Sequence, residues 1–309
     1  MKVAACKYPV GEPADFAAFA AKQEALLGEA KASGAQLALL PEYLSLELAA
    51  MFDAATRGDL RASLAAIQPL REAWLALYTG LARDLDLHIV AGSFLVDTGH
   101  GRYRNRSDLF APDHGGRGGH LWQDKLRLTG FEKAAGVIES GDALKVFEVD
   151  GVRAGIAVCY DSEFPMPVRA QHEAGARLLL VPSCTDTPAG ATRVRVGCLA
   201  RALENRMFVA QAVTAGVAPW SPALDANTGE AALVAPMDAG LPDDGVLAQT
   251  RGNDTWAIAE LDFAALDASR SRAQVANDRD WPAQYFPTVL RARLERAGDH
   301  VASPRLARA

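Results

Sequence analysis

The sequence contains little that would indicate a metal, a membrane or a nucleic acid as a partner. Its four cysteines show no paired short spacing such as CxxC, which argues against a zinc site and a disulfide framework; they are Cys6, Cys159, Cys184 and Cys198. The 32 Lys and Arg face 38 Asp and Glu, a net charge of −6, so a phosphate backbone is not an expected ligand. No apolar run approaches the roughly 18 residues of a membrane span, and the first run, in MKVAACKYPV, is too short for a signal peptide. We therefore expect a soluble, cytoplasmic protein.

The sequence does contain enough apolar residues for a large core. It has 309 residues, of which half are apolar, and a chain of this length buries roughly three quarters of its unfolded surface. It therefore needs no metal or disulfide for stability. No internal repeat or low-complexity linker marks a boundary, which favours one domain over two.

Predicted strands and helices alternate along the chain. Apolar residues at helical spacing predict a helix from Phe16 to Ala30, which Asp15 can cap. A longer helical pattern from Leu60 to Leu85 is interrupted at Pro69. The Asp-Gly pair at 150–151 is the strongest hairpin signal. Further helices are predicted over 167–174 and 192–205, and strands over 37–40, 87–94, 103–111, 120–125, 147–149, 152–158, 177–181, 207–213 and 255–261. Because hairpins and helical connections both occur, we predict an α/β fold with mixed sheets.

Cys159 is the cysteine whose surroundings suggest chemistry. It lies where the apolar strand GVRAGIAV meets CYDSEFPMP and a helix that Pro167 can open. A thiol at such a corner lies near helix N–H groups, which favour the thiolate. We therefore interpret Cys159 as a nucleophile, whereas the other three cysteines fit the usual role of a small buried hydrophobe.

A nucleophilic thiol requires a base and a group that stabilises the oxyanion. Histidine is the first candidate base, yet none of the six follows an obvious strand end: His88 falls within a predicted strand, His172 within a helix, and the rest in loops or the tail, namely His100, His114, His120 and His300. A Cys–His pair stays open, because such partners meet in space rather than in sequence. The loop histidines lack a companion carboxylate pattern, which favours a surface position over a metal site.

Two charged residues do stand at strand ends. Glu42 follows LALLP, and Lys125 follows HLWQD. A buried Glu beside a Lys has coupled titrations, and such a pair can activate a thiol, with Glu42 accepting the proton of Cys159. Lys125 and the backbone N–H of Tyr160 would then stabilise the oxyanion. Taken singly, each charge is more typical of a solvated surface.

Three segments together resemble the carbon–nitrogen hydrolase family, or nitrilase superfamily, in its amidase-like branch. They are LALLPEY around Glu42, DKLRLTGFE around Lys125 and GIAVCYDSEFP around Cys159, in the family's order and at similar separations. The resemblance extends through GARLLLVPSCTDT and RVRVGCLARALENRMFVAQAV. It predicts one hydrolase domain over 1–265 and a C-terminal extension over 266–309, which is either a solvated terminus or an arm packed across a partner subunit.

The resemblance implies a four-layer αββα sandwich with two mixed, six-stranded-type sheets, and a homodimer or higher homo-oligomer. It also implies a Glu–Lys–Cys triad without a cofactor, in which Glu42 is the general base, Lys125 the oxyanion partner and Cys159 the nucleophile. A thioester or thioimidate forms, ammonia or an amine leaves, and water releases the acyl group. Family members carry a second Glu that positions substrate and relays protons, and Glu132 fits that place.

One departure from the family concerns the substrate. Several relatives that bind carboxylate-bearing substrates have Arg four residues after the nucleophile, where this chain has Glu163. An anion there repels a carboxylate and attracts an amine, so ω-amidase-like and N-carbamoyl amino acid substrates are disfavoured. Alternatively, Glu163 is held by Arg169 or Arg127.

Further residues are expected near the nucleophile. Thr185 and Asp186 follow the next strand and are candidates for the pocket lining. Arg193 and Arg195 receive no catalytic role. Core packing is favoured over a pocket-wall role for three aromatic residues, Trp122, Tyr43 and Trp220.

The leading hypothesis is therefore hydrolysis of a small linear amide at a non-peptide C–N bond. Nitrile hydrolysis with the same triad and acyl transfer to an amine are alternative activities. A catalytically idle partner module of the same fold is the alternative from another class. Buried carboxylates, an ammonium and a thiol are costly to keep without a function, which argues against the idle module.

Overall fold

The computed structural model describes residues 1–112, 119–287, 290–292 and 294. Its strands are β1 (Lys2–Pro9), β2 (Leu37–Leu39), β3 (His88–Gly99), β4 (Arg102–Ala111), β5 (Gly119–Asp124), β6 (Ile138–Glu139), β7 (Val146–Val149), β8 (Val152–Ile156), β9 (Leu178–Ser183), β10 (Phe208–Ala215), β11 (Ala232–Val234), β12 (Val246–Gln249) and β13 (Trp256–Glu260).

The α-helices are α1 (Phe16–Ala32), α2 (Ala54–Arg57), α3 (Leu60–Ile67), α4 (Arg71–Asp84), α5 (Gly130–Ala135), α6 (Pro165–Glu173), α7 (Pro188–Asn205), α8 (Phe263–Ala268) and α9 (Asn277–Asp280). Short 3₁₀ turns are η1 (Leu44–Met51), η2 (Gln68–Leu70), η3 (Cys159–Glu163), η4 (Ser269–Arg272) and η5 (Trp281–Tyr285). No helix in the described ranges is both long enough and apolar enough to cross a membrane.

Strand β1 joins the two halves of the strand arrangement. It pairs in parallel with β2, with Val3 opposite Leu37, and its last residues pair in parallel with β10, with Lys7 opposite Val213. The main order is β5-β4-β3-β2-β1-β10-β9-β8-β7. The six strands from β3 to β8 in this order run parallel, and β5 has the same direction because the antiparallel β4 separates it from β3. The carboxyl ends of β2, β5, β8 and β9 therefore lie at one edge.

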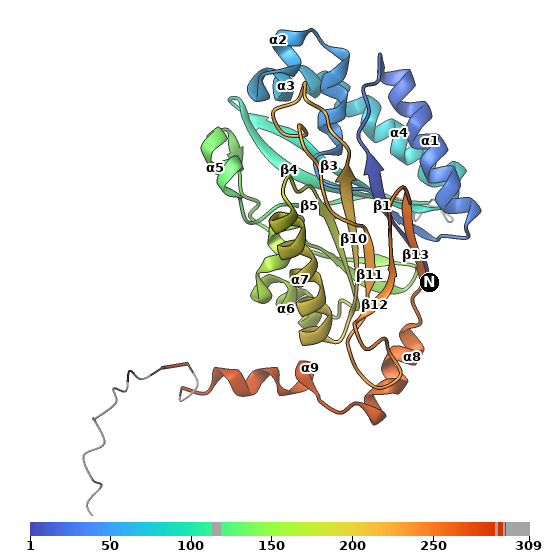
Figure 1. Ribbon diagram of the computed structural model, residues 1–309, viewed down its shortest axis with the longest axis vertical. Helices are drawn as coiled ribbons and strands as arrows, with labels where there is room; N and C mark the ends of the chain where they lie inside the picture. Colours follow the sequence, from blue (N-terminus) through green and yellow to red (C-terminus); the bar gives the residue numbers. More distant parts are fainter. Residues whose placement is uncertain (113–118, 288–289, 293, 295–309) are drawn as a thin grey trace, which may run out of the picture.

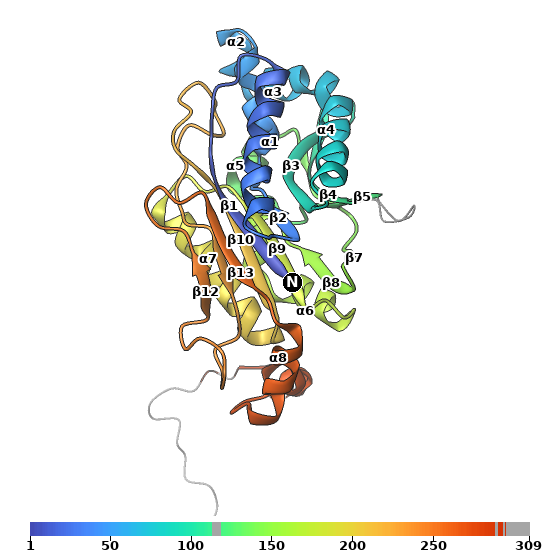
Figure 2. The ribbon, with the colours of Figure 1, turned by 90° about the vertical axis from the view of Figure 1, so that its right-hand side faces the viewer.

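The mixed α/β architecture is confirmed. Figures 1 and 2 show α1 and α4 on one side of the strands and α7 on the other. Because one hydrogen-bonded network includes all the strands of the described ranges, the division into two six-stranded sheets and the number of layers stay predictions.

Helix α1 illustrates how the local sequence builds a layer. The Asp15 side chain accepts a hydrogen bond from the N–H of Ala18 at 2.8 Å and caps the helix. Its buried stripe includes Phe19, which stacks on Trp74 of α4 at a centroid distance of 5.7 Å. Each buried ring of this size contributes a few kcal/mol. Pro69 lies in η2 between α3 and α4, which confirms the predicted interruption.

The first part of the C-terminal extension packs on its own chain. The Arg169 side chain of α6 donates a hydrogen bond to the carbonyl of Asp278 at 3.0 Å and lies over the Trp281 ring at 5.2 Å. The basic helix expected after Trp281 falls mostly outside the described residues, as does His114. The choice between a solvated end and a dimer arm therefore stays open for 295–309.

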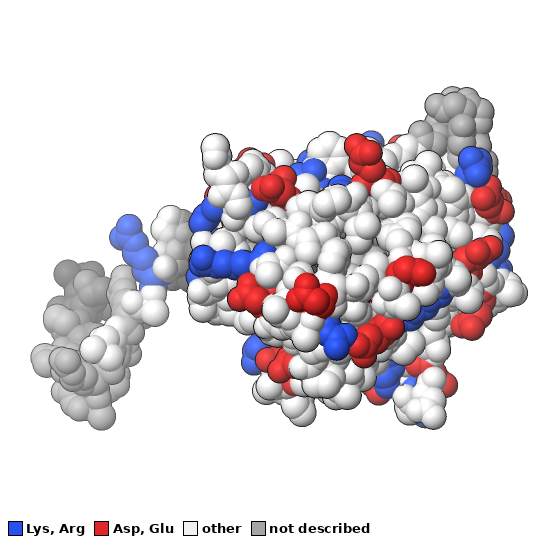
Figure 3. Space-filling model, turned by 90° about the horizontal axis from the view of Figure 1, so that it is seen from above, with Lys and Arg blue, Asp and Glu red and all other residues white. Residues whose placement is uncertain are grey.

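Figure 3 looks onto the end of the molecule where β1 and β10 finish. Lys and Arg side chains are interspersed there with Asp and Glu and do not gather into a basic patch. This distribution on the visible face agrees with the net charge of −6 and differs from the basic stripe typical of nucleic-acid-binding proteins.

Candidate active site

Three predicted residues meet at the edge where parallel strands end. Glu42 lies three residues after β2, Lys125 directly after β5 and Cys159 three residues after β8. All three line one cavity of about 270 Å³. Ligands of α/β proteins commonly bind beyond the carboxyl ends of the strands, so this cavity is the candidate active site.

A close backbone approach fixes the position of Glu42. Gly92 of β3 has a φ of +64°, and a Cβ atom there would lie 2.0 Å from the carbonyl oxygen of Pro41. Only glycine allows that contact. The next residue, Tyr43, has a φ of 61° and donates its N–H to Ser93 Oγ at 2.8 Å. The turn after β2 is therefore held on β3, with the Glu42 carboxylate aimed into the cavity lining.

The Lys125 ammonium lies between two carboxylates. Its Nζ donates to Glu42 Oε1 and to Glu132 Oε2, both at 2.8 Å. The Asn105 side-chain amide bridges the same two groups, at 2.8 Å to Glu42 Oε1 and 3.2 Å to Glu132 Oε1. Lys125 and Glu42 are each 1% exposed and Glu132 is fully buried. Three charges so deeply buried persist only when paired.

Glu132 also caps a helix. Thr129 and Glu132 form a reciprocal capping box at the start of α5, and Glu132 Oε1 accepts a hydrogen bond from the Tyr43 hydroxyl at 2.8 Å. The carboxylate is therefore held by the backbone of its own helix as well as by Lys125. Its position beside Lys125 is the one that the family resemblance implies.

Cys159 begins a strained turn. Its φ is 49°, a left-handed value that is costly for a residue with a side chain and is often found at functional sites. The thiol donates to the carbonyl of Cys184 at 3.6 Å, and the N–H of Cys184 donates to Glu42 Oε2 at 3.1 Å. The segment after β9 thus links the nucleophile to the candidate base.

The electrostatics of the site correct one expectation from the sequence. Burial and the nearby Glu42 charge raise the pKa of the Cys159 thiol well above its ordinary value, and Lys125 only partly opposes this. The expected thiolate is wrong for the resting state because burial outweighs the short 3₁₀ turn at Cys159, whose dipole is small. The resting thiol is neutral and needs a base.

Glu42 has the properties of that base. Burial raises its pKa and outweighs the opposing effects of the Lys125 ammonium and of a hydrogen bond from the Cys159 thiol. For Lys125, burial favours the neutral form, but the Glu42 and Glu132 charges prevail and raise the pKa. For Glu132, burial is outweighed by Lys125, and the pKa is lowered. A proton acceptor therefore lies beside an ammonium that keeps its charge.

Sequence reasoning missed Asp161. Its carboxylate accepts hydrogen bonds from three backbone N–H groups. The donors are Leu126, at 3.1 and 3.2 Å to the two oxygens, Arg127 at 2.7 Å and Val158 at 3.3 Å. These residues flank Lys125 and Cys159, so one buried side chain fixes the separation of both segments. Its place two residues after the nucleophile, at the end of an apolar strand, was the available signal.

The rim of the cavity carries the other predicted residues. Tyr160, Glu163, Thr185 and Asp186 all line it, and Thr185 Oγ1 donates to the Thr228 carbonyl at 2.7 Å. Glu163 pairs with Arg193, with Oε1 3.6 Å from Nε. The expected partners of Glu163 are wrong: Arg169 pairs with Glu173, and Arg127 lies over the Phe164 ring. Arg193 therefore belongs to the pocket lining, whereas Arg195 is exposed and not among the described lining residues.

Of the three aromatic residues considered from the sequence, one lines the cavity. Tyr43 lines the cavity and also packs in the core. Trp122 stacks on His120, and Trp220 lies beside Arg57 at 6.0 Å; neither is among the described lining residues.

The histidines do not supply the base within the described part of the chain. His120, which closes the glycine-rich loop and begins the predicted strand 120–125, belongs to β5. Its ring lies 2.8 Å from the buried Asp108 and stacks on Phe110. His88 belongs to β3 as predicted and faces Asp150 at 3.0 Å. No described histidine lines the cavity, so Glu42 is the candidate base.

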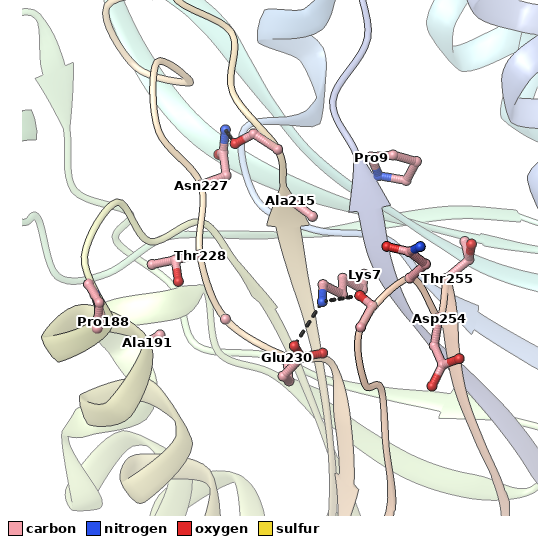
Figure 4. Close-up of a pocket in the computed structure, with 14 residues that line it drawn as sticks. Lys7, Pro9, Pro188, Ala191, Ala215, Asn227, Thr228, Glu230, Asp254 and Thr255 are labelled. Atoms are coloured by element: carbon pink, nitrogen blue, oxygen red, sulfur yellow. Dashed lines mark hydrogen bonds and ion pairs between the residues drawn. The ribbon is translucent and has the colours of Figure 1, made fainter.

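A second and larger cavity, of about 770 Å³, lies near the end of β1 (Figure 4). It contains the ion pair between Lys7 and Glu230, at 2.8 Å, and Lys7 also donates to the carbonyl of Gly252 at 2.9 Å. None of its described lining residues is a cysteine or a histidine. Volume alone therefore does not identify the reactive site.

Comparison with known proteins identifies the family. A model of the carbon–nitrogen hydrolase family matches residues 2–266. The chain is 28% identical to the probable hydrolase YhcX of Bacillus subtilis over 283 residues, which cover 91% of this chain and 53% of that protein. It is 25% identical to the omega-amidase NIT2 of Xenopus tropicalis over 64% of this chain and 70% of that protein. The match therefore spans about half the length of the Bacillus relative.

Among solved structures, an amidase from Nesterenkonia sp. AN1 has the same fold, with a TM-score of 0.63 and 24% identity over 91% of this chain and 99% of that one. The family model identifies the class, which consists of enzymes that hydrolyse carbon–nitrogen bonds. The chain belongs to the carbon–nitrogen hydrolase family.

Proposed function

We propose that this protein hydrolyses a small linear amide through a thioester on Cys159. The observation that carries the proposal is the contact of the Lys125 ammonium with two carboxylates, those of Glu42 and of the fully buried Glu132, while Lys125, Glu42 and Cys159 line one cavity. The Nesterenkonia amidase structure shows acrylamide added to that enzyme's active-site cysteine, which supports a cysteine nucleophile in this fold.

In the first half-reaction, Cys159 Sγ attacks the amide carbon while Glu42 takes the thiol proton. The carbonyl becomes a tetrahedral oxyanion, for which the Lys125 ammonium and the backbone N–H of Tyr160 are the candidate donors. Glu42 then passes its proton to the amide nitrogen. The C–N bond breaks, ammonia leaves, and a thioester remains.

In the second half-reaction, Glu42 takes a proton from water, and the resulting hydroxide attacks the thioester carbon. The C–S bond breaks, the carboxylic acid leaves, and the thiol recovers its proton. Glu132 keeps Lys125 charged and in place through both steps, because its Oε2 accepts a hydrogen bond from Nζ at 2.8 Å.

Ammonia release from a panel of linear amides, carbamoyl compounds and nitriles tests this function. We expect amides to be turned over by the wild type and not by Cys159→Ala, whose fold should be intact by circular dichroism. Turnover of a nitrile but not of its amide would favour the nitrilase alternative. Absence of product from the whole panel would favour the idle module.

We also propose that residues 1–265 form the catalytic unit, that the enzyme acts in the cytoplasm without a cofactor, and that it assembles as a homodimer or higher homo-oligomer. Exposed apolar side chains on α6 and α7, namely Met166, Val196 and Leu203, support a subunit contact. Light scattering coupled to size exclusion should give at least twice the 32.8 kDa chain mass. A monomer at micromolar concentration would contradict this assembly.

A further inference from the structure

The rim of the active-site cavity carries an excess of negative charge. Three carboxylates of the described lining stand there, on Glu163, Asp186 and Asp225, against one guanidinium, on Arg193. Asp186 and Asp225 are exposed, and no residue in the described ranges forms a hydrogen bond or ion pair with their carboxylates. Their charges are therefore available to a ligand.

Arg193 does not reverse this excess. Its Nε lies 3.6 Å from Glu163 Oε1, and its side chain is 62% exposed against 20% for Glu163. The guanidinium is thus hydrated and already faces a less exposed carboxylate. With this pair neutral, Asp186 and Asp225 leave the rim with a charge of −2.

The charged groups at the floor of the cavity are also negative overall. Glu42 and Lys125 line the cavity, and the buried Glu132 pairs with Lys125 without being among the described lining residues. With both carboxylates ionised and the thiol neutral, these groups together carry a net charge of −1. An anionic substrate is repelled both on entry and at the floor, whereas a cation is attracted along the same path, and low-dielectric walls focus such a field.

Aromatic side chains also line the cavity. Phe131, 44% exposed, and Tyr160 both line the cavity. A protonated amine over such rings gains a cation–π attraction in addition to its contact with carboxylates. Rings and carboxylates together are a recognition environment for an alkylammonium group, and neither favours a carboxylate.

We propose that the substrate is a linear amide whose far end carries a protonated amine, held at the rim by Asp186 and Asp225. This inference rests on the proposed amidase function, because Cys159 must face the amide end while the amine reaches the rim. Glu163 contributes by occupying Arg193, which would otherwise attract a substrate carboxylate. The leaving group stays ammonia, so the reaction is unchanged and only its substrate class is specified.

Three amides of matched length test the charge preference: the amide of δ-aminovaleric acid, hexanamide and the monoamide of glutaric acid. They differ in a terminal ammonium, methyl or carboxylate. Binding to Cys159→Ala, measured by calorimetry at low salt, should be at least about tenfold tighter for the cationic amide than for hexanamide, and weakest for the anionic amide, with the differences shrinking as salt is added. Equal binding, stronger binding of the anion, or no binding of the cation would overturn the inference.

Variants at the rim assign the preference to residues. Asp186→Asn with Asp225→Asn should remove most of the advantage of the cationic amide over hexanamide. Asp243→Asn, which replaces an exposed carboxylate between β11 and β12, is the matched control and should keep that advantage. Glu163→Gln should improve binding of the anionic amide by releasing Arg193. A cationic preference that survives the double variant would contradict the assignment. Wild-type turnover is measured separately: absence of ammonia from all three amides would refute the amidase function, while binding still decides the charge preference.

Discussion

A rise in pH should have opposite effects on the two contributions of Asp161: its contribution to stability falls and its contribution to activity grows. Replacing Asp161 with asparagine should remove both effects. Asp161 is 3% exposed. Burial raises its pKa from 3.8 to about 6, although the N–H groups of Leu126 and Arg127 and the charge of Lys125 oppose the shift. This difference between the ordinary and the folded-state pKa corresponds to about 3 kcal/mol. The folded protein therefore ionises this carboxyl at a cost in stability.

The sign of each effect follows from the direction of the shift. Because the pKa is higher in the folded state, Asp161 contributes stability that is fully present below about pH 4 and is lost as the pH rises through about 6. Catalysis requires the ionised form, since only a carboxylate accepts hydrogen bonds from the N–H groups beside both Lys125 and Cys159. We expect kcat to fall as the pH drops through about 6.

Asp161→Asn keeps one acceptor oxygen but cannot ionise. At about pH 8 its free energy of unfolding should differ from the wild type by less than about 2 kcal/mol, because the loss of charge-assisted hydrogen bonds, about 1.5–3 kcal/mol each, is offset by removal of a buried charge. Its kcat should fall by about 10- to 100-fold, the scale for slight misplacement of reacting groups.

Urea unfolding and ammonia release from about pH 4 to about pH 8 measure both effects, with Asp243→Asn as the control. The wild type should lose stability relative to Asp161→Asn as the pH rises to about 6. The acid limb of kcat should be shallower in the variant, in which protonation of Glu42 is its remaining cause. Parallel stability curves for the two proteins, or a wild-type kcat in the variant, would refute the reasoning.

Other perturbations test the remaining parts of the site. Lys125→Ala should lower kcat/KM at least about 10²-fold and destabilise the fold by about 3–5 kcal/mol, because it leaves two buried carboxylates without their cation; near wild-type activity would contradict its role. Gly92→Ala should destabilise the protein by more than about 2 kcal/mol, since its Cβ would overlap the Pro41 carbonyl, and thermal melting would show this; an unchanged melting temperature would mean that the turn can shift. Iodoacetamide with peptide mapping should label Cys159 fastest at neutral pH. Glu42→Gln should slow that labelling at least about tenfold by removing the base; equal labelling of all four cysteines would favour the idle module.

Much of the fold could be predicted because its signals are local. The Asp-Gly turn between β7 and β8 has φ values of 47° at Asp150 and 75° at Gly151, as a tight hairpin requires. Pro69 separates α3 and α4 for an equally local reason. By contrast, η1 (Leu44–Met51) is buried along nearly its whole length, so no alternation of apolar and polar residues marked it. Helix α5 is too short for periodicity, although the Thr129–Glu132 capping box was a readable signal.

The site also contains residues with a local sequence signal and residues that only the tertiary fold brings into place. Charged residues close to the ends of apolar strands pointed to Glu42 and Lys125, because strand ends can be predicted from sequence. The side chains that hold them, Asn105 and Asp161, come from segments that meet only in three dimensions. The neutral state of Cys159 was also missed, since the depth of burial that raises its pKa depends on the whole fold.

The covalent intermediate is the most direct test of the central claim that Cys159 is the nucleophile. Acid-quenched mixtures of enzyme and amide, taken during turnover and analysed by intact-mass and peptide mass spectrometry, should show the mass of one acyl group on the peptide that contains Cys159. Ammonia release without that adduct, together with continued turnover by Cys159→Ala, would contradict the account.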